Sequence, residues 1–164
     1  MNEANIFGTL IGKKVVKLSR VCLVNIDNSI DELTDTFVFT LSTGQTFQAL
    51  VNQENILLKE ITQNEGYIAS FPLEDGESLR ISNIAEDIKT PFTIHGITEI
   101  WAGSSQLLLV AVKFFDSEKK SIFSILTETD DIDILEEDHI TSIVEKMVFG
   151  YRRVVHLWHD SNNN

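Results

Sequence analysis

Leu107–Leu126, with the sequence LLLVAVKFFDSEKKSIFSIL, is the stretch that decides the fold. It consists of an unbroken apolar run, a short charged interruption and a second run rich in β-branched and aromatic residues. Two such runs joined by residues that prefer water are typical of a buried β-hairpin. Because Leu107–Val112 shows no alternation of polar and apolar residues, we expect a central strand that is covered on both faces.

A second hairpin is predicted over Phe37–Val51, where one side of each run is apolar. Gly44 stands between the two runs, and because glycine tolerates a positive φ, we expect the turn there. Aromatic residues of the two hairpins fall in strand patterns and are expected in the core: Phe37, Phe39, Phe47, Phe114 and Phe123.

A third hairpin is predicted around Asp75-Gly76, a dipeptide suited to a two-residue turn. Its strands would be Tyr67–Glu74 and Glu77–Ser82. Pro72 cannot donate a ladder hydrogen bond, so the first of these strands is expected at an edge or at a bulge.

Three further strands are predicted, and two segments leave helix and strand open. The strands are Lys13–Ile26, Gly96–Trp101 and Tyr151–Trp158. Residues 53–61 are undecided, and in residues 138–149 the apolar side chains recur at helical spacing. The second segment favours a helix, although its β-branched residues leave a strand possible.

These patterns predict an α+β protein that is mainly antiparallel β, with two β-meander halves and one or two short helices. With 164 residues and 43% hydrophobic content, the chain is expected to form a single domain over residues 1–164. The halves, residues 8–92 and 93–160, suggest an internal repeat in which Phe37–Leu41 matches Val110–Phe114 and the second hairpin turn is two residues longer. Strand patterns resemble one another by default, so a chance likeness stays open.

The charge of the chain is strongly negative, at −12, with a sequence pI of about 4.6. Binding to nucleic acid needs clustered Lys and Arg, and the densest group here, Lys13, Lys14 and Lys17 with Arg20 nearby, is better explained as a solvated strand face. We therefore expect no nucleic-acid partner. An acidic surface is typical of a soluble protein or of one that meets a basic partner.

Cys22 is the only cysteine, which excludes an internal disulfide and a cysteine-based zinc cluster, and we expect it to be a small buried hydrophobe. The first residues lack the basic and apolar regions of a signal peptide. The longest apolar run, Leu107–Val112, is too short to span a bilayer. A cytoplasmic location without a membrane partner is expected.

Catalytic motifs are missing from the sequence. The eight glycines are dispersed, so no phosphate-binding loop is formed, and Gly103-Ser104-Ser105 lacks the second glycine of a nucleophile elbow. A pair of carboxylates brought together by the fold stays open. We expect a non-catalytic protein without a cofactor.

His156 and His159, with Asp160 beside them, suggest a metal site, but on a strand the two histidines would face opposite sides. No metal site is therefore expected. Residues near strand ends are candidates for lining a pocket or an interface, with core packing as the competing interpretation for the aromatic ones. These are His95, Trp101, Tyr151 and Trp158.

Thr127–Asp138 is strongly acidic. A helix–loop–helix calcium site is excluded, because isoleucines interrupt the carboxylates and no glycine supplies the bend. Alternation of aspartate and isoleucine here is typical of a half-exposed strand. The functional alternative is a negatively charged surface that docks a basic partner, formed by Glu128, Asp130, Asp131, Asp133, Glu136 and Glu137.

The leading functional hypothesis is a small acidic binding module that acts through protein–protein contacts, for example an immunity-type protein that masks a basic toxin or nuclease. The alternative is a small-molecule-binding or hydrolytic domain with its site between the two halves. A third hypothesis is a homodimer that pairs exposed strands such as Tyr67–Glu74.

Overall fold

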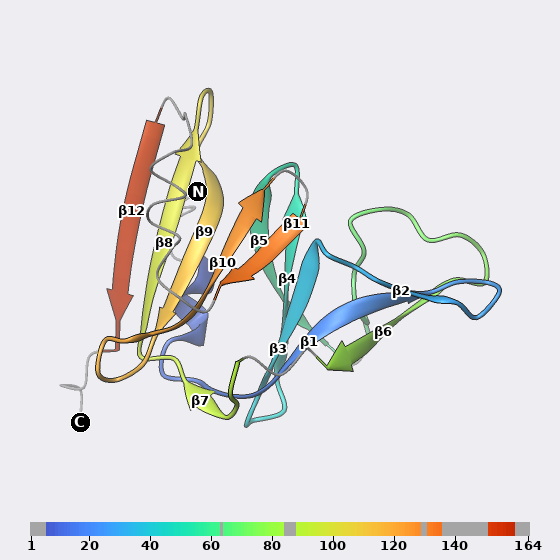
Figure 1. Cartoon of the computed structure of the whole chain (residues 1–164), viewed down its shortest axis with the longest axis horizontal. Coiled ribbons are helices and arrows are strands. Elements are labelled where there is room, and N and C mark those ends of the chain that lie inside the picture. Colours follow the sequence, from blue (N-terminus) through green and yellow to red (C-terminus); the bar gives the residue numbers. More distant parts are fainter. Residues whose placement is uncertain (1–5, 63, 84–87, 129–130, 136–150, 160–164) are drawn as a thin grey trace.

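The structure is a computed structural model that describes residues 6–62, 64–83, 88–128, 131–135 and 151–159. Within these ranges the chain forms two antiparallel sheets, sheet A and sheet B, and one 3-10 turn, η1 (Ile6–Leu10), but no α-helix (Figure 1). The prediction of a mainly antiparallel β protein is confirmed. Among the described residues, none belongs to a helix with the length and apolar character needed to cross a membrane.

Sheet A is organised around one long strand, β1 (Lys14–Val24), which confirms the strand predicted over Lys13–Ile26. Ser19 of β1 pairs with Val38 on one side and with Asn83 on the other, so neighbouring strands lie along both edges of β1. These neighbours and the rest of the sheet are β2 (Ile30–Glu32), β3 (Thr36–Leu41), β4 (Thr46–Asn52), β5 (Asn55–Ile61), β6 (Ser78–Asn83) and β7 (Phe92–Thr93).

Sheet B has the order β11-β10-β9-β8-β12. The predicted hairpin is confirmed: β9 (Leu108–Phe115) pairs with β10 (Ser121–Glu128), and β9 is the central strand, with all its interior residues buried. The other strands are β8 (Gly96–Gly103), β11 (Asp131–Leu135) and β12 (Tyr151–Trp158). The strands predicted over Gly96–Trp101 and Tyr151–Trp158 are therefore confirmed as well.

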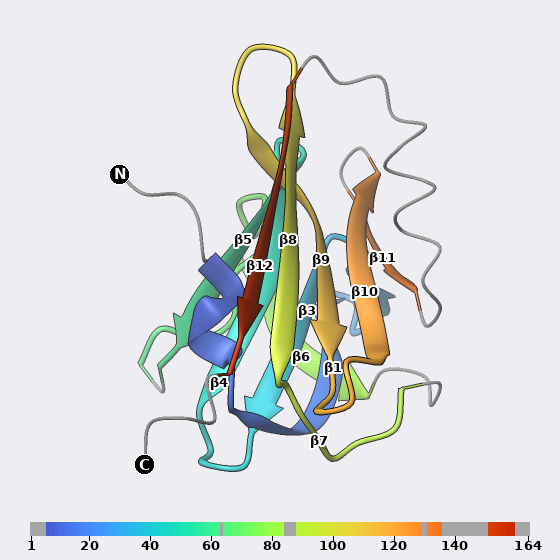
Figure 2. The ribbon, with the colours of Figure 1, turned by 90° about the vertical axis from the view of Figure 1, so that its left-hand side faces the viewer.

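Phenylalanine rings from both sheets meet in one hydrophobic core, and in Figure 2 sheet B lies in front of sheet A. Phe39 of β3 lies 5.5 Å from Phe114 of β9, and Phe37 lies 6.1 Å from Phe123 of β10, as distances between ring centroids. Phe7 of η1 contacts Phe39 and Phe114 from the side. All five phenylalanines predicted for the core are buried, as is Cys22.

Backbone groups near Thr34 and a single arginine connect the two sheets at one edge. Ile132 N, on β11, donates to Thr34 O at 2.8 Å. The guanidinium of Arg20 donates to the carbonyls of Thr34 and Thr36 through Nη1 and to Ile132 O through Nη2, at 3.1–3.3 Å. Arg20 is thus a structural connection between β1 and β11.

The two large hairpins have turns of the same construction. Leu41 N donates to Gln45 O and Gly44 N to Leu41 O, and Asp116 N donates to Lys120 O and Lys119 N to Asp116 O in the same way. Gly44 and Lys119 both have positive φ, at 87° and 63°. The expected two-residue difference in turn length is therefore wrong.

The sequence leaves helix and strand open for two segments. Residues 53–61 contain a strand, β5, and no helix. The helix considered over residues 138–149 lies outside the described residues, as does Asp160.

The hairpin predicted around Asp75-Gly76 is wrong, although the turn itself is present, with Gly76 at φ 92°. Tyr67–Glu74 forms no strand, and β6 pairs with β1 instead. The start of this segment is held by β4 instead. The side-chain amide of Gln48 donates to Ile68 O at 2.6 Å and accepts from Ile68 N at 2.9 Å, so the backbone of Ile68 is bound to a side chain and not to a partner strand. The exposed strand considered for a homodimer does not exist.

Replacing Arg20 with alanine should destabilise the fold. The Arg20→Ala variant loses three hydrogen bonds to backbone carbonyls, which is expected to lower the free energy of unfolding by about 1–3 kcal/mol. Chemical denaturation measures this quantity. Lys17→Ala is the matched control, because Lys17 is exposed on the same strand, and it should stay within about 0.5 kcal/mol of the parent. Equal effects of the two variants would contradict the role given to Arg20.

Candidate functional site

A hollow of about 530 Å³ lies where β8 begins and β12 ends, and we call it the histidine hollow. Five described residues line it: His95, Ser117, Lys119, Trp158 and His159. They come from the start of β8, the β9–β10 turn and the end of β12, which lie at the same end of sheet B (Figure 1). A volume of this size is typical of sites for small ligands.

Backbone hydrogen bonds position both histidines of the hollow. His95 N donates to Phe115 O at 2.9 Å, and His159 N donates to His95 O at 2.8 Å. The two imidazole rings therefore lie side by side, with centroids 6.3 Å apart in an edge-to-face arrangement. His156 points elsewhere, because its Nδ1 shares a 2.8 Å hydrogen bond with the hydroxyl of Thr98.

The β9–β10 turn holds Lys119 above an indole ring. The carboxylate of Asp116 accepts hydrogen bonds from the backbone N–H groups of Glu118 and Lys120, both at 2.9 Å, and so fixes the turn. Lys119 Nζ lies 5.4 Å from the centroid of the Trp158 ring, a cation–π contact. Trp158 is 41% exposed as a residue, and its ring also contacts Phe115, at 5.4 Å between centroids.

Two glycines make room for the rings of the hollow. Gly96 pairs directly with Trp158, and a Cβ atom at position 96 would lie 2.3 Å from two atoms of the indole ring. Gly12 has φ 77°, and a Cβ atom there would lie 3.3 Å from the His159 ring. The indole of Trp158 thus lies directly on the backbone of β8, where only glycine leaves enough space.

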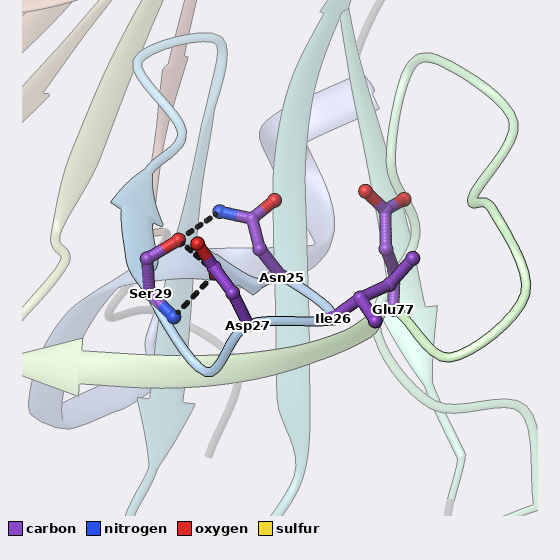
Figure 3. Close-up of a pocket in the computed structure, with 5 residues that line it drawn as sticks. All are labelled: Asn25, Ile26, Asp27, Ser29 and Glu77. Atoms are coloured by element: carbon purple, nitrogen blue, oxygen red, sulfur yellow. Dashed lines mark hydrogen bonds between the residues drawn. The ribbon is translucent and has the colours of Figure 1, made fainter.

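A second, shallower hollow of about 350 Å³ lies at the β1–β2 turn (Figure 3). Asp27 Oδ1 accepts hydrogen bonds from Ser29 Oγ at 2.5 Å and from Ser29 N at 2.9 Å. Asn25 Nδ2 donates to Ser29 Oγ and to Asp31 Oδ2. The hydrogen bonds from the hydroxyl and the N–H of Ser29 lower the pKa of Asp27. These polar contacts fix the turn of a protruding hairpin.

This hairpin and the segment before β6 form a surface that we call the acidic arm, residues 25–32 and 71–77. The two segments meet where the side chain of Ile26 lies near Gly76, within 3.5 Å of the position that a Cβ atom would take there. No Lys or Arg occurs in either range. The arm carries the carboxylates Asp27, Asp31, Glu32, Glu74, Asp75 and Glu77.

Apolar side chains are exposed among these carboxylates. In the part of the chain that the structure describes, four of the seven exposed large apolar residues lie on the arm. They are Ile26, Ile30, Phe71 and Leu73, and Ile26 is 64% exposed. Apolar residues rimmed by charges on a protruding element are typical of an interaction surface.

The structure brings together only two of the four predicted pocket residues, His95 and Trp158. Trp101 is 3% exposed and packs in the core, where its Nε1 donates to the buried Glu99 at 3.2 Å. Glu99 also accepts a hydrogen bond from Phe7 N at 2.8 Å and so holds η1 against β8. Tyr151 begins β12 and Trp158 ends it, so they lie at opposite ends of that strand.

The predicted acidic surface is described only in part. Glu128 ends β10, and Asp131 and Asp133 lie on β11. Asp131 is exposed and accepts a 2.5 Å hydrogen bond from the hydroxyl of Thr34. The other three residues, Asp130, Glu136 and Glu137, lie outside the described residues.

Sequence reasoning missed Ser117, Lys119 and His159 as neighbours in one hollow. His159 had been grouped with His156 by sequence proximity, whereas the structure places it beside His95. Among the described residues, no group of three or more His, Cys, Asp or Glu side chains is arranged to hold a metal ion.

Removing the hydroxyl of Ser29 should raise the pKa of Asp27 toward its ordinary value. A lowered carboxyl pKa stabilises the fold at pH values above the pKa of the unfolded chain, and this contribution is lost as the pH falls through the folded-state pKa. The Ser29→Ala variant should therefore shift the titration of Asp27 upward, as measured by carbon NMR of the carboxyl group. Ser42→Ala, at an exposed position in another turn, should leave this titration unchanged, and an identical pKa in all three proteins would disprove the assignment.

Substituting Gly96 by alanine should force the Trp158 ring away from β8. The added Cβ atom would overlap the ring, and overpacking of this kind typically costs about 1–3 kcal/mol in the free energy of unfolding. Thermal or chemical unfolding measures the loss. In a Trp158→Ala background the same substitution should cost clearly less, because the overlapping ring is gone; an equal cost in both backgrounds would show that the ring is not the cause.

Comparison with known proteins gives no assignment for either surface: no protein-family model, no curated protein and no solved structure shows significant similarity to the chain.

Proposed function

We propose that the protein is a small acidic binding module without catalytic activity, which acts through contacts with a basic protein partner. The observation that carries this proposal is the acidic arm, where exposed apolar side chains stand among carboxylates without any Lys or Arg. A net charge of −12 adds a long-range attraction toward a basic partner. One version of this function is an immunity-type protein that masks the basic surface of a toxin or nuclease.

The arm has the physical properties that such a contact needs. Ile26 and Leu73 supply apolar surface that loses contact with water on binding, which provides affinity. The carboxylates around them favour association with a positively charged surface and disfavour acidic partners. The hairpin protrudes from the end of the molecule opposite β12 (Figure 1), so a partner can approach it without meeting sheet B.

The acidic residues predicted between Glu128 and Glu137 are proposed as a further part of the negative surface. Asp131 is exposed at the edge strand β11, which supports this extension. The arm carries the stronger argument, because it combines negative charge with exposed apolar area.

We also propose that the two halves of the chain are an internal repeat. The two sheets contain the same arrangement: four strands pair in sequence order, and a later strand pairs with the first of them. These arrangements are β6-β1-β3-β4-β5 and β12-β8-β9-β10-β11. The turns at Gly44 and Lys119 are also built alike. An experimental structure in which the two meanders superpose in the register set by these turns would support the repeat, and a register that differs between them would refute it.

Affinity capture with the purified chain as bait tests the proposed function. We expect a basic protein to be retained, released at about 1 M salt because of screening, and bound directly when purified. The variant Ile26→Ser/Leu73→Ser should weaken this binding by about tenfold or more. Val154→Ser is the matched control, because Val154 is an exposed apolar residue on β12, outside the arm.

The proposal fails if the retained protein is not basic, or if its affinity is the same for the arm variant and the control. It also fails if binding persists unchanged at high salt, because the carboxylates would then contribute nothing. Circular dichroism of both variants checks that the fold is intact, since all three substituted side chains are exposed.

A further inference from the structure

We propose that the histidine hollow binds a small organic anion that carries a planar ring, such as an aromatic carboxylate or an aromatic phosphate ester. This site is separate from the acidic arm and would serve a function that protein–protein contacts through the arm do not explain. The hollow lies at the end of β12, and Figure 1 shows that β12 and the hairpin of the arm lie at opposite ends of the long axis.

The charge lining the hollow is opposite to the charge of the chain as a whole. The chain has 25 acidic residues against 13 basic ones. Even so, the described lining residues supply an ammonium, two imidazoles, a hydroxyl and an indole, and no carboxylate. Among the described residues, the acidic side chains nearest in sequence have partners of their own: Glu118 forms a 2.9 Å ion pair with Lys120, and Asp116 accepts two backbone hydrogen bonds in the turn. Asp160, next to His159, lies outside the described residues.

The lining supplies hydrogen-bond donors suited to an anion. Lys119 carries three N–H donors, each neutral imidazole carries one, and the hydroxyl of Ser117 can donate one more. Backbone hydrogen bonds hold the main chain of His95 and His159, and the two rings contact each other, so the donors lie close together before a ligand binds. Preorganised donors reduce the entropic cost of binding.

The exposed indole of Trp158 supplies a surface for the ring of the ligand. Its position is fixed by contact with Gly96 and Phe115, and Lys119 Nζ now lies over it. On binding, the ligand ring would stack on the indole, and the flexible lysine would turn from the indole toward the anionic group. A weak cation–π contact is thereby exchanged for aromatic stacking and a charge-assisted hydrogen bond.

The test is isothermal titration with six small probes. Indole-3-acetate and adenosine monophosphate are the two aromatic anions, indole and adenosine are their neutral counterparts, and acetate and inorganic phosphate lack a ring. We expect at least one aromatic anion to bind with Kd below about 1 mM, and its neutral and ring-free counterparts at least about tenfold more weakly. The stronger of the two aromatic anions distinguishes a carboxylate ligand from a phosphate ligand.

Variants of the β9–β10 turn assign the site. Lys119→Asn removes the ammonium, so it should lower the affinity for the anion about tenfold or more. Because asparagine tolerates the positive φ of 63° at this position, the turn should stay folded. Glu118→Gln/Lys120→Gln is the control, because it removes an ion pair of the same turn that does not line the hollow and leaves the net charge unchanged. Its affinity should equal that of the parent.

Three titration results would overturn the proposal: neither aromatic anion binds with Kd below about 1 mM, a neutral ring binds as well as the anion, or the Lys119 variant and its control lose affinity equally. Amide NMR shifts must change around His95, Lys119 and His159, and shifts confined to the acidic arm would also refute it. None of these results bears on the proposed partner of the arm, so the two proposals fail independently.

Discussion

The packing of phenylalanine rings between the sheets is the constraint on which the rest of the structure depends. Each of the two large hairpins has a face with Phe side chains that must leave water, and neither can bury that face alone. The contacts of Phe39 with Phe114 and of Phe37 with Phe123 bury both faces at once. Everything outside this contact, including the acidic arm and the histidine hollow, is built on strands whose positions it fixes.

The sequence predicts the parts of the fold that depend on local pattern. Leu107–Leu126 and Phe37–Val51 are hairpins because their turns and apolar runs are adjacent in the chain, and their phenylalanines are buried as expected. The strand predicted over Tyr67–Glu74 is wrong because the contacts of this region are distant in sequence: β6 pairs with β1, and Gln48 binds the backbone of Ile68. The histidine hollow could be predicted only in part, since Lys119 and His159 meet through strand pairing between β8, β9 and β12, which no local pattern reports.

The two candidate surfaces divide the chemistry of the molecule. The arm combines carboxylates with exposed apolar residues, whereas the described lining of the hollow combines an ammonium with imidazoles and an indole. Polar groups inside the fold have structural tasks instead: Glu99 binds the N–H groups of Phe7 and Trp101, and Arg20 binds backbone carbonyls of both sheets. This separation explains why composition alone indicates an acidic protein and gives no sign of a site for an anion.

The way the two sheets are closed has a consequence for how the chain folds. In each sheet the meander forms from strands that are neighbours in sequence. The first strand of each meander, β1 or β8, also pairs along its other edge with a strand from much farther along the chain. These partners are β6 for β1 and β12 for β8. Such distant pairings require large loops to close first, which slows folding. During synthesis β8 must wait with an open edge until β12 has left the ribosome, and in that interval it can pair with another nascent chain.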